Sequence, residues 1–383
     1  MARQGPMKVR EASPAELADW DARTVDVPGG DVQQSRTWAS YRSRHGWRPR
    51  FLVFDDGFML LSLERPWRWV PGGGAYLSRG PVSAGEPAET TAERLRAAAD
   101  WLAGHGIDVV SSDSEIPADT GYPDLLRAWG FHQIEEVQPS RHRVALSLGG
   151  ADEEGLFRSF ATSTRQRVRG AERRGYRIIR FDARPHDSSE KLFELAAHQE
   201  LSAEALAPML ERFYDLLIAT AQRRHFSLMR HPGMFVDWAS HALADGLAVH
   251  LEVRAPDDRP LGAALFYRHG GRLTYANSAD HTELRRDYPG VVHFLLWRAI
   301  QLAVRDGLRE VDLGGVDVPG QRRKPLEGEE MYGLLAFKES FGGRWVEQAG
   351  NHEWVARPWR YLAGRLTGRL AGQRQALASR PGS

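Results

Sequence analysis

Two stretches decide how the chain is organised: residues 96–110, RAAADWLAGHGIDVV, and residues 297–311, WRAIQLAVRDGLREV. Each begins with apolar residues at helical spacing, breaks at a glycine, and continues into an apolar run typical of a buried strand, with an Asp close by. In both halves this unit follows short segments that alternate like antiparallel strands. The repeat therefore predicts two domains of the same mixed α+β kind in tandem.

The flanking segments give the expected limits of the domains. Hairpins over residues 131–148 and 344–355 are expected to close the first and second domains, and Gly149-Gly150 is typical of a linker. The predicted parts of the chain are a first domain of residues 1–149, a second domain of residues 150–357 and a basic amphipathic tail of residues 358–383.

Composition restricts the classes of protein and of chemistry. The chain has 383 residues, of which 42% are hydrophobic, so it is long enough for two well-packed domains. The absence of cysteine excludes disulfides, cysteine-ligated zinc, iron–sulfur clusters and thiol nucleophiles. No apolar run approaches the roughly 20 residues of a membrane span, and the N-terminus lacks the apolar core of a signal peptide. We expect a soluble, cytoplasmic protein.

Positive charge is concentrated in two segments, although the net charge is only +1. Residues 158–180 contain eight Arg and one Glu, and residues 357–383 contain six Arg and no acidic residue. Arg165, Arg169 and Arg173 are spaced by four and share one face of a predicted helix. Such a face suits a phosphate backbone, but a solvated helix has the same composition, so both interpretations stay open.

Several catalytic motifs are missing from the sequence. It contains neither the GxSxG elbow of serine hydrolases nor the HExxH pair of zinc peptidases, and its histidines show no metal-ligand spacing. Residues 315–320 have the glycine spacing of a phosphate loop, but Gln321 and Arg322 follow instead of Lys and Ser or Thr. This segment is interpreted as a flexible active-site or surface loop.

Residues 331–358, MYGLLAFKESFGGRWVEQAGNHEWVARP, combine a helix, a Lys after a Phe, and a Phe-Gly-Gly turn before a strand. This stretch resembles the closing signature of the Fem-type aminoacyltransferases (FemA, FemB and FemX), which build peptidoglycan cross-bridges from aminoacyl-tRNA. The matching positions are Gly333, Leu334, Phe337, Lys338, Phe341, Gly342, Gly343, Glu347 and Gly350.

Further segments resemble other blocks of that family, in the same order over roughly residues 33–357. They are residues 34–47, QSRTWASYRSRHGW; 76–82, YLSRGPV; 137–139, VQP; 164–176, TRQRVRGAERRGY; and the set Arg224, Phe226, Arg230 and Phe235. The resemblance implies an α+β chain of two acetyltransferase-like (GNAT-type) domains in tandem. No long coiled-coil arm is inserted, so the chain is similar to the compact FemX type.

The resemblance also implies roles for individual residues. Arg230 matches an arginine that contacts the phosphates of the acceptor precursor, and Tyr275 lies where the family has a tyrosine at the acceptor cleft. Arg42 is the best substitute for a first-domain phosphate contact that is a lysine in some members, and Trp38 of the same block is assigned with it to substrate binding. The face of Arg165, Arg169 and Arg173 is assigned to tRNA.

Lys338 matches the lysine implicated in stabilising the transition state, and Phe337 precedes it. Aminoacyl transfer from a tRNA ester to an amine passes through a tetrahedral oxyanion, which a positioned ammonium and a backbone N–H stabilise by a few kcal/mol. The ester is already activated, so no metal, cofactor or covalent nucleophile is expected, and no general base is assigned. The alternative for Lys338 is a surface lysine in an ion pair.

The sequence thus predicts an aminoacyltransferase that moves an amino acid from aminoacyl-tRNA to the stem peptide of a lipid-linked or nucleotide-linked peptidoglycan precursor. Three alternatives stay open: a Fem-like enzyme acting on a small metabolite, an acyl-CoA-dependent N-acyltransferase, and a non-catalytic tandem-domain binding protein. Acyl-CoA transfer needs an Arg/Gln-x-x-Gly-x-Gly/Ala turn at a helix start, whereas residues 286–294, RDYPGVVHF, contain one Gly.

The basic tail has an apolar side. Leu362, Leu366 and Leu370 are spaced by four, with Arg365 and Arg369 beside them. This pattern fits an amphipathic helix lying on anionic lipid at the inner face of the membrane, where a membrane-bound acceptor is found. Packing of the same leucines on the body of the protein, or contact with tRNA, would produce the same pattern.

Overall fold

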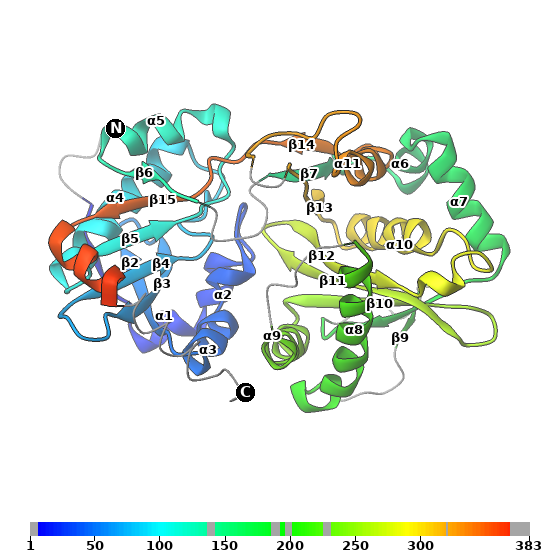
Figure 1. The fold of residues 1–383 in the computed structure, drawn as a ribbon, viewed down its shortest axis with the longest axis horizontal. Helices are drawn as coiled ribbons and strands as arrows, with labels where there is room; N and C mark the ends of the chain where they lie inside the picture. The colour runs from blue at the N-terminus through cyan, green and yellow to red at the C-terminus, as the bar shows by residue number, and fades with distance from the viewer. Residues whose placement is uncertain are drawn as a thin grey trace, which may run out of the picture. The chain divides into compact units, whose positions relative to one another are not determined.

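The computed structural model describes residues 7–135, 142–184, 192–195, 201–224, 231–318 and 321–367. The chain divides into two compact units, the first formed by Met1–Val137 with Gln348–Ser383 and the second by Gln138–Glu347. Each unit contains one mixed sheet with helices packed on it (Figure 1). This arrangement confirms the predicted α+β class.

The first unit holds a seven-stranded sheet in the order β1-β2-β3-β4-β5-β15-β6. Its strands are β1 (Val9–Glu11), β2 (Arg48–Phe54), β3 (Met59–Pro66), β4 (Gly73–Leu77), β5 (Val109–Ser112), β6 (His132–Gln133) and β15 (His352–Val355). Its helices are α1 (Pro14–Ala18), α2 (Trp20–Thr24), α3 (Arg36–Arg44), α4 (Ala88–Gly104) and α5 (Tyr122–Ala128), and residues 358–367 are also helical.

The second unit holds an eight-stranded sheet in the order β14-β7-β13-β12-β11-β10-β8-β9. Its strands are β7 (Arg143–Ser147), β8 (Arg177–Phe181), β9 (Glu194–Leu195), β10 (Ala248–Arg254), β11 (Pro260–His269), β12 (Arg272–Asp280), β13 (Glu310–Gly315) and β14 (Arg344–Val346). Its helices are α6 (Glu153–Ser159), α7 (Thr162–Arg173), α8 (Ala203–Arg224), α9 (Pro232–Ala244), α10 (Val291–Arg305) and α11 (Tyr332–Glu339).

The two sheets have equivalent topologies. Read from β8, the second sheet runs β8-β10-β11-β12-β13-β7-β14, which matches the first sheet strand for strand. Each sheet has a parallel pair next to an antiparallel meander, β4 with β5 in the first and β12 with β13 in the second. The second sheet also has the short parallel pair of β8 with β9 at its edge. The crossovers from β4 to β5 and from β12 to β13 contain the predicted repeat, in α4 and α10. The internal duplication expected from residues 96–110 and 297–311 is therefore present.

The two predicted hairpins are wrong, because one strand of each belongs to the other sheet. Strand β7 pairs with β13 and β14 in the second sheet, whereas β15 pairs with β5 and β6 in the first. Gly149 and Gly150, with φ of 42° and 76°, form a turn between β7 and α6 inside the second unit and are not a linker. The two units accordingly divide the chain differently from the expected limits at 149 and 357.

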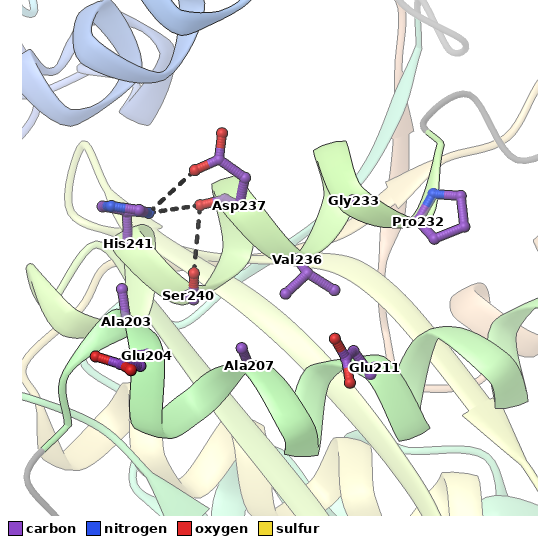
Figure 2. A pocket seen from close by; sticks show the side chains of 10 residues that line it. All are labelled: Ala203, Glu204, Ala207, Glu211, Pro232, Gly233, Val236, Asp237, Ser240 and His241. Carbon is purple, nitrogen blue, oxygen red and sulfur yellow. Dashed lines mark hydrogen bonds and ion pairs between the residues drawn. The ribbon is translucent and has the colours of Figure 1, made fainter.

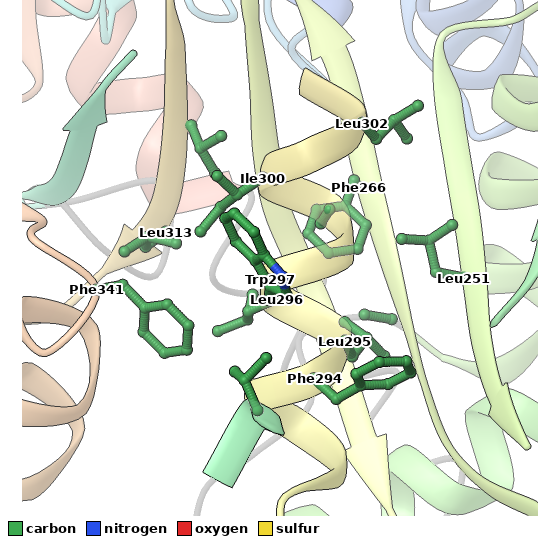
Figure 3. Packing of buried hydrophobic residues seen from close by; sticks show 14 of the residues in the cluster. Leu251, Phe266, Phe294, Leu295, Leu296, Trp297, Ile300, Leu302, Leu313 and Phe341 are labelled. Carbon is green, nitrogen blue, oxygen red and sulfur yellow. The ribbon is translucent and has the colours of Figure 1, made fainter. Parts of the chain in front are cut away.

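The core of the second unit lies between its sheet and helix α10 (Figure 3). Phe294, Leu295 and Trp297 of α10 pack with Phe266 of β11 and with Phe341, which follows α11. All five are at most 5% exposed. Because truncating such a side chain costs roughly 3–5 kcal/mol, this layer holds α10 and the segment after α11 firmly against the strands.

In the described part of the chain, no helix is both long enough and apolar enough to cross a membrane. The predicted amphipathic tail is helical over residues 358–367, and residues 368–383, with Arg369 and Leu370, lie outside the described residues.

Candidate active site

The parallel strands β12 and β13 separate before they end. Their register covers three pairs, from Arg272 opposite Glu310 to Thr274 opposite Asp312. Beyond it, β12 has an irregularity in its pairing with β11, and β13 has one in its pairing with β7. The carboxyl ends of parallel strands are common positions for ligands in mixed α and β folds, so this point is a natural place for a site.

Lys338 of α11 reaches the end of β13. Its Nζ donates a hydrogen bond to the carbonyl oxygen of Gly315 at 3.2 Å, and the side chain is only 4% exposed. Gly314 is glycine for two reasons: its φ is +80°, and a Cβ there would lie 3.3 Å from Lys338 Nζ and 3.0 Å from the carbonyl oxygen of Tyr275. The lysine amine, the backbone of β13 and that of β12 therefore converge at one point.

The Phe-Gly-Gly turn explains how α11 is positioned. After Phe341, Gly342 has φ of +82°, and Gly343 has no room for a side chain because a Cβ would lie 2.6 Å from Val144 of β7. The turn leads directly into β14, which pairs with β7. The helix carrying Lys338 is thus held on the sheet at its C-terminal end, as the predicted turn before a strand required.

Burial sets the electrostatics of Lys338. Removal from water lowers its pKa to about 8, and the carboxylate of Asp312 on β13 opposes this effect. Asp312 is itself 4% exposed, and its Oδ1 accepts a hydrogen bond from the Gly314 N–H at 2.8 Å. Lys338 is therefore mostly an ammonium at neutral pH, and the interpretation as an exposed ion-pair lysine is excluded by its burial.

Phe337 faces the first turn of α10. Its ring contacts His293 edge-on, with 5.0 Å between ring centroids, and Phe341 at 5.5 Å. Burial, with the nearby guanidinium of Arg167, lowers the pKa of His293 to about 4, so this imidazole is neutral at pH 7. Phe337 forms part of an aromatic wall one residue from Lys338.

Helix α7 is joined to the Lys338 helix. Thr164 Oγ1 and Ser340 Oγ form a hydrogen bond of 2.8 Å, and the Ala161 N–H donates to the Ser340 carbonyl oxygen at 2.9 Å. The buried side of α7 carries Thr164, Val168 and Ala171. This packing leaves the predicted arginine face outward and places the start of α7 beside the end of α11.

The three arginines of that face have different surroundings. Arg165 donates to the Arg158 carbonyl oxygen at 2.6 Å and to Thr162 Oγ1 at 3.1 Å, which orients it toward the helix start. The Arg169 guanidinium lies 5.4 Å from the ring centre of Phe157, and Arg173 is exposed in the last turn.

Tyr275 is near the site through its backbone more than through its hydroxyl. Its carbonyl oxygen faces Gly314, whereas its hydroxyl donates to Ser278 Oγ on the same strand and its ring packs 5.4 Å from that of Phe266.

Arg42 and Trp38 belong to the first unit. Both lie on α3, where the Arg42 guanidinium stands 5.4 Å from the Trp38 ring and 4.7 Å from the Trp47 ring. Trp38 is buried, and two indole rings hold the cation, an arrangement that favours a delocalised guanidinium. Arg230 lies outside the described residues, as do Phe226 and the segments 137–139 and 319–320.

A second polar cluster, at the ends of the parallel strands β4 and β5, was not predicted as a site. Asp113 is 2% exposed and accepts hydrogen bonds from the Tyr76 hydroxyl at 2.7 Å and the Arg79 N–H at 2.6 Å. Burial raises the pKa of Asp113, against the opposing charge of Arg79. Arg79 has φ of +54°, which is rare for a residue with a side chain. Two features of the sequence could have indicated this cluster: residues 76–82, YLSRGPV, and Asp113, which follows the strand of the first repeat.

A cavity of about 380 Å³ lies between α8 and α9 (Figure 2). Its walls are mostly apolar, with Glu204 and Glu211 on α8, and His241 on α9 lies 3.3 Å from Asp237 Oδ1. No predicted site residue lines it. In the described part of the chain, no group of three or more His, Asp or Glu side chains is arranged to hold a metal ion.

Comparisons with known proteins agree with this description. Residues 158–338 match the family model "Acetyltransferase (GNAT) domain", which is a domain of acyl-transfer enzymes and confirms the predicted enzyme class. A search of curated proteins finds no match.

Among solved structures, FemX is similar with a TM-score of 0.71 at 19% identity, covering 93% of this chain and 100% of FemX. A conserved protein of unknown function from Bacteroides thetaiotaomicron has a TM-score of 0.52 at 10% identity, covering 91% of this chain and 98% of its own. L-PGS from Bacillus licheniformis has a TM-score of 0.49 at 12% identity, with 96% and 99% covered. The chain therefore has the fold of FemX, as the resemblance predicted.

Proposed function

We propose that the protein transfers an aminoacyl group from aminoacyl-tRNA to an amine of the stem peptide of a peptidoglycan precursor. The observation that carries this proposal is the buried Lys338 ammonium at the point where β12 and β13 separate, beside the start of the arginine-bearing helix α7. The acyl-transfer class of the matched domain and the FemX-like fold support it.

The proposed reaction is an ester-to-amide exchange. The acceptor amine attacks the carbonyl carbon of the aminoacyl ester, and the tetrahedral intermediate carries an oxyanion. When it collapses, the C–O bond to the terminal ribose breaks, the tRNA hydroxyl leaves with a proton, and the former amine nitrogen loses one. Lys338 would face the oxyanion, because a cation that is fixed before the reaction stabilises developing charge without reorganisation.

Burial makes this lysine suited to that role. Few competing dipoles of water surround an amine that is 4% exposed, so its charge acts at higher strength than it would on the surface. The Asp312 carboxylate helps to keep the Lys338 amine protonated, and the pKa of Lys338 is about 8. Near neutral pH, Lys338 is therefore a charged ammonium during the amide-forming transfer.

The outward face of α7 would bind the donor. Arg165, Arg169 and Arg173 suit RNA phosphates, and the hydrogen bonds of Thr164 and Ala161 to Ser340 join that helix to the Lys338 helix. A tRNA held on this face would bring its acylated end toward Lys338 and Phe337.

Tyr275 and Arg230 of the second unit would bind the acceptor. Arg42 and Trp38 of the first unit are assigned separately to substrate binding. The Arg42 guanidinium lies over two indole rings, those of Trp38 and Trp47, and would contact a phosphate of the precursor. A cytoplasmic enzyme with peripheral contact to the inner membrane face would have both tRNA and lipid-linked precursors within reach.

A transfer assay tests the proposal. Purified protein is incubated with radiolabelled aminoacyl-tRNAs and a nucleotide-linked muropeptide. We expect label on the muropeptide, lost when the donor is treated with RNase beforehand. Lys338→Met should slow transfer by roughly 10²–10³-fold. The control is Lys324→Met, which removes an exposed lysine paired with Glu339 of α11 and should leave the transfer rate unchanged. No transfer to any muropeptide would refute the proposal.

Acyl-CoA-dependent N-acylation is the second candidate, because the matched domain is an acetyltransferase domain. Against it, the segment before α10 has a single glycine, Gly290 at the N-cap, and α7 approaches that position closely: a Cβ on Gly290 would lie 2.9 Å from the carbonyl oxygen of Arg167. Turnover of acyl-CoA with an amine in the same assay, without transfer from tRNA, would favour this candidate.

A further inference from the structure

The helix of residues 358–367 presents an apolar side to solvent. Trp359, Leu362 and Leu366 are 84%, 51% and 61% exposed, which is unusual for side chains of this size. They are spaced by three and four residues, so they share one face of the helix. The alternative in which these leucines pack on the body is therefore wrong for Leu362 and Leu366.

The opposite side of the same helix is fixed to the first unit. The Tyr361 hydroxyl donates to Glu353 Oε1 on β15 at 2.7 Å, and its ring centroid is 6.4 Å from that of Trp67. Gly364 touches Trp67 so closely that a Cβ would lie 2.4 Å from the indole. These contacts determine which face is free, so the exposure of the apolar side is a property of the packed helix.

The loop that carries Trp67 exposes a further tryptophan. Trp69, two residues after Trp67 in the loop between β3 and β4, is 53% exposed, with the Arg68 guanidinium 5.1 Å from its ring centre. Residues 65–72 and 357–367 together contain five Arg and no Asp or Glu. On the helix, Arg360 and Arg365 stand on either side of the apolar stripe and are exposed.

We propose that the exposed side of this helix, formed by Trp359, Leu362 and Leu366 with Arg360 and Arg365, docks on an anionic lipid bilayer. An amphipathic helix with tryptophan and leucine on one side and arginines at its edges lies in the plane of the interface, with its apolar side below the headgroups and its cations among them. Tryptophan is enriched at that depth. This proposal goes beyond aminoacyl transfer and does not rest on it.

Charge and polarity favour lipid over the other occupants. A second copy of the chain docked symmetrically on this surface would bring its arginines against the same arginines, and like charges repel. A tRNA backbone would satisfy the arginines but would cover Trp359 and the leucines with phosphates. An anionic bilayer satisfies both, because it offers negative headgroups above an apolar layer.

Vesicle flotation tests the proposal with the full-length protein. We expect binding to vesicles of phosphatidylcholine with phosphatidylglycerol, at least tenfold weaker binding to pure phosphatidylcholine, and release by salt. The triple variant Trp359→Ser, Leu362→Ser, Leu366→Ser should bind anionic vesicles at least tenfold more weakly. A matched control is Leu195→Ser with Leu326→Ser, which removes leucines of the second unit that are 51% and 64% exposed. It should bind like the wild type.

Three results would overturn the proposal. They are no wild-type binding to anionic vesicles, unchanged binding of the triple variant, and a wild-type dimer that the triple variant converts to monomer, which would assign the surface to a second copy. Thermal unfolding of the variants verifies that they fold. Transfer to a nucleotide-linked acceptor needs no vesicle, so failure of docking and failure of the proposed function are distinguishable.

Discussion

Asp312→Asn tests whether Lys338 works as an ammonium. Asn retains an oxygen that accepts the Gly314 N–H bond, so the turn at the end of β13 is preserved while the negative charge is lost. Burial lowers the pKa of Lys338 to about 8, and Asp312 is the group that opposes it. Without that carboxylate the pKa of Lys338 falls further, and the ammonium is lost at a lower pH.

The size of the effect follows from the titration of one group. With a pKa of about 8, Lys338 is roughly 90% protonated at pH 7 and half protonated at pH 8. If the variant loses about 1.4 kcal/mol of charge attraction, the midpoint of the pH–rate profile moves about one pH unit toward acid, and roughly half of the lysine stays protonated at pH 7. The rate on the acidic side should be unchanged.

The assay is single-turnover transfer from preloaded aminoacyl-tRNA between pH 6 and 9, corrected for ester hydrolysis. Titration of the acceptor amine is common to all variants and cancels in the comparison. Glu310→Gln is the control, because it removes the same charge from the same strand, while Asp312 is the charged group that acts on the pKa of Lys338 and Glu310 pairs with Arg143. If the Asp312→Asn midpoint coincides with the wild-type midpoint, or moves toward alkali, Lys338 does not act through its charge.

Three further predictions concern the same unit. The folded-state pKa of Lys338 lies below its ordinary 10.5, so the unfolded chain binds this proton more tightly and the free energy of unfolding rises with pH between about 8 and 10.5. Lys338→Met should therefore stabilise the fold at pH 7 by about 1–3 kcal/mol. Denaturant unfolding should find no such gain above pH 10.5. A destabilised variant at pH 7 would contradict this. Gly314→Ala should slow transfer at least tenfold, because its Cβ would crowd Lys338 Nζ. The control Gly328→Ala changes a glycine with a similar φ of +90° and no atom within 4 Å of its Cβ, so it should be as active as wild type. Equal transfer rates of the two variants would show that the close approach of Gly314 to Lys338 is unimportant. The double variant Arg165→Glu, Arg169→Glu should weaken tRNA binding more than tenfold at low salt and flatten the salt dependence of that binding. Arg212→Glu on α8 should leave tRNA binding unchanged. If the double variant also binds tRNA like the wild type in a filter assay, the arginine side of α7 is only a solvated surface.

Local patterns in the sequence were sufficient for the repeated unit. In α4 and α10 the apolar spacing and the glycine after each helix are properties of adjacent residues, and the following strands are apolar runs. The sheet that a strand joins, and the strands with which it pairs, are not determined by adjacent residues. Strand β7 alternates as a strand should, but the partners that select it, β13 and β14, lie more than 150 residues later in the chain. A hairpin with the preceding segment was therefore the natural, incorrect prediction.

The site divides in the same way. The resemblance of residues 331–358 selected Lys338 from the sequence, while a surface lysine in an ion pair stayed open as the alternative. The hydrogen bond of Lys338 to Gly315 and its proximity to Asp312 depend on how α11 folds back on β13, which the turn at Gly342-Gly343 determines only together with Val144. The buried Asp113 with Tyr76 and Arg79 joins residues more than 30 positions apart, so only the tertiary structure reveals the cluster.

The most direct test of the central claim is the rate of the chemical step in Lys338→Met. Single-turnover transfer at pH 7, with both substrates saturating, separates that step from binding. The account predicts a rate roughly 10²–10³-fold below wild type, with Lys324→Met equal to wild type. A Lys338→Met rate within twofold of wild type would contradict the claim that this ammonium stabilises the oxyanion.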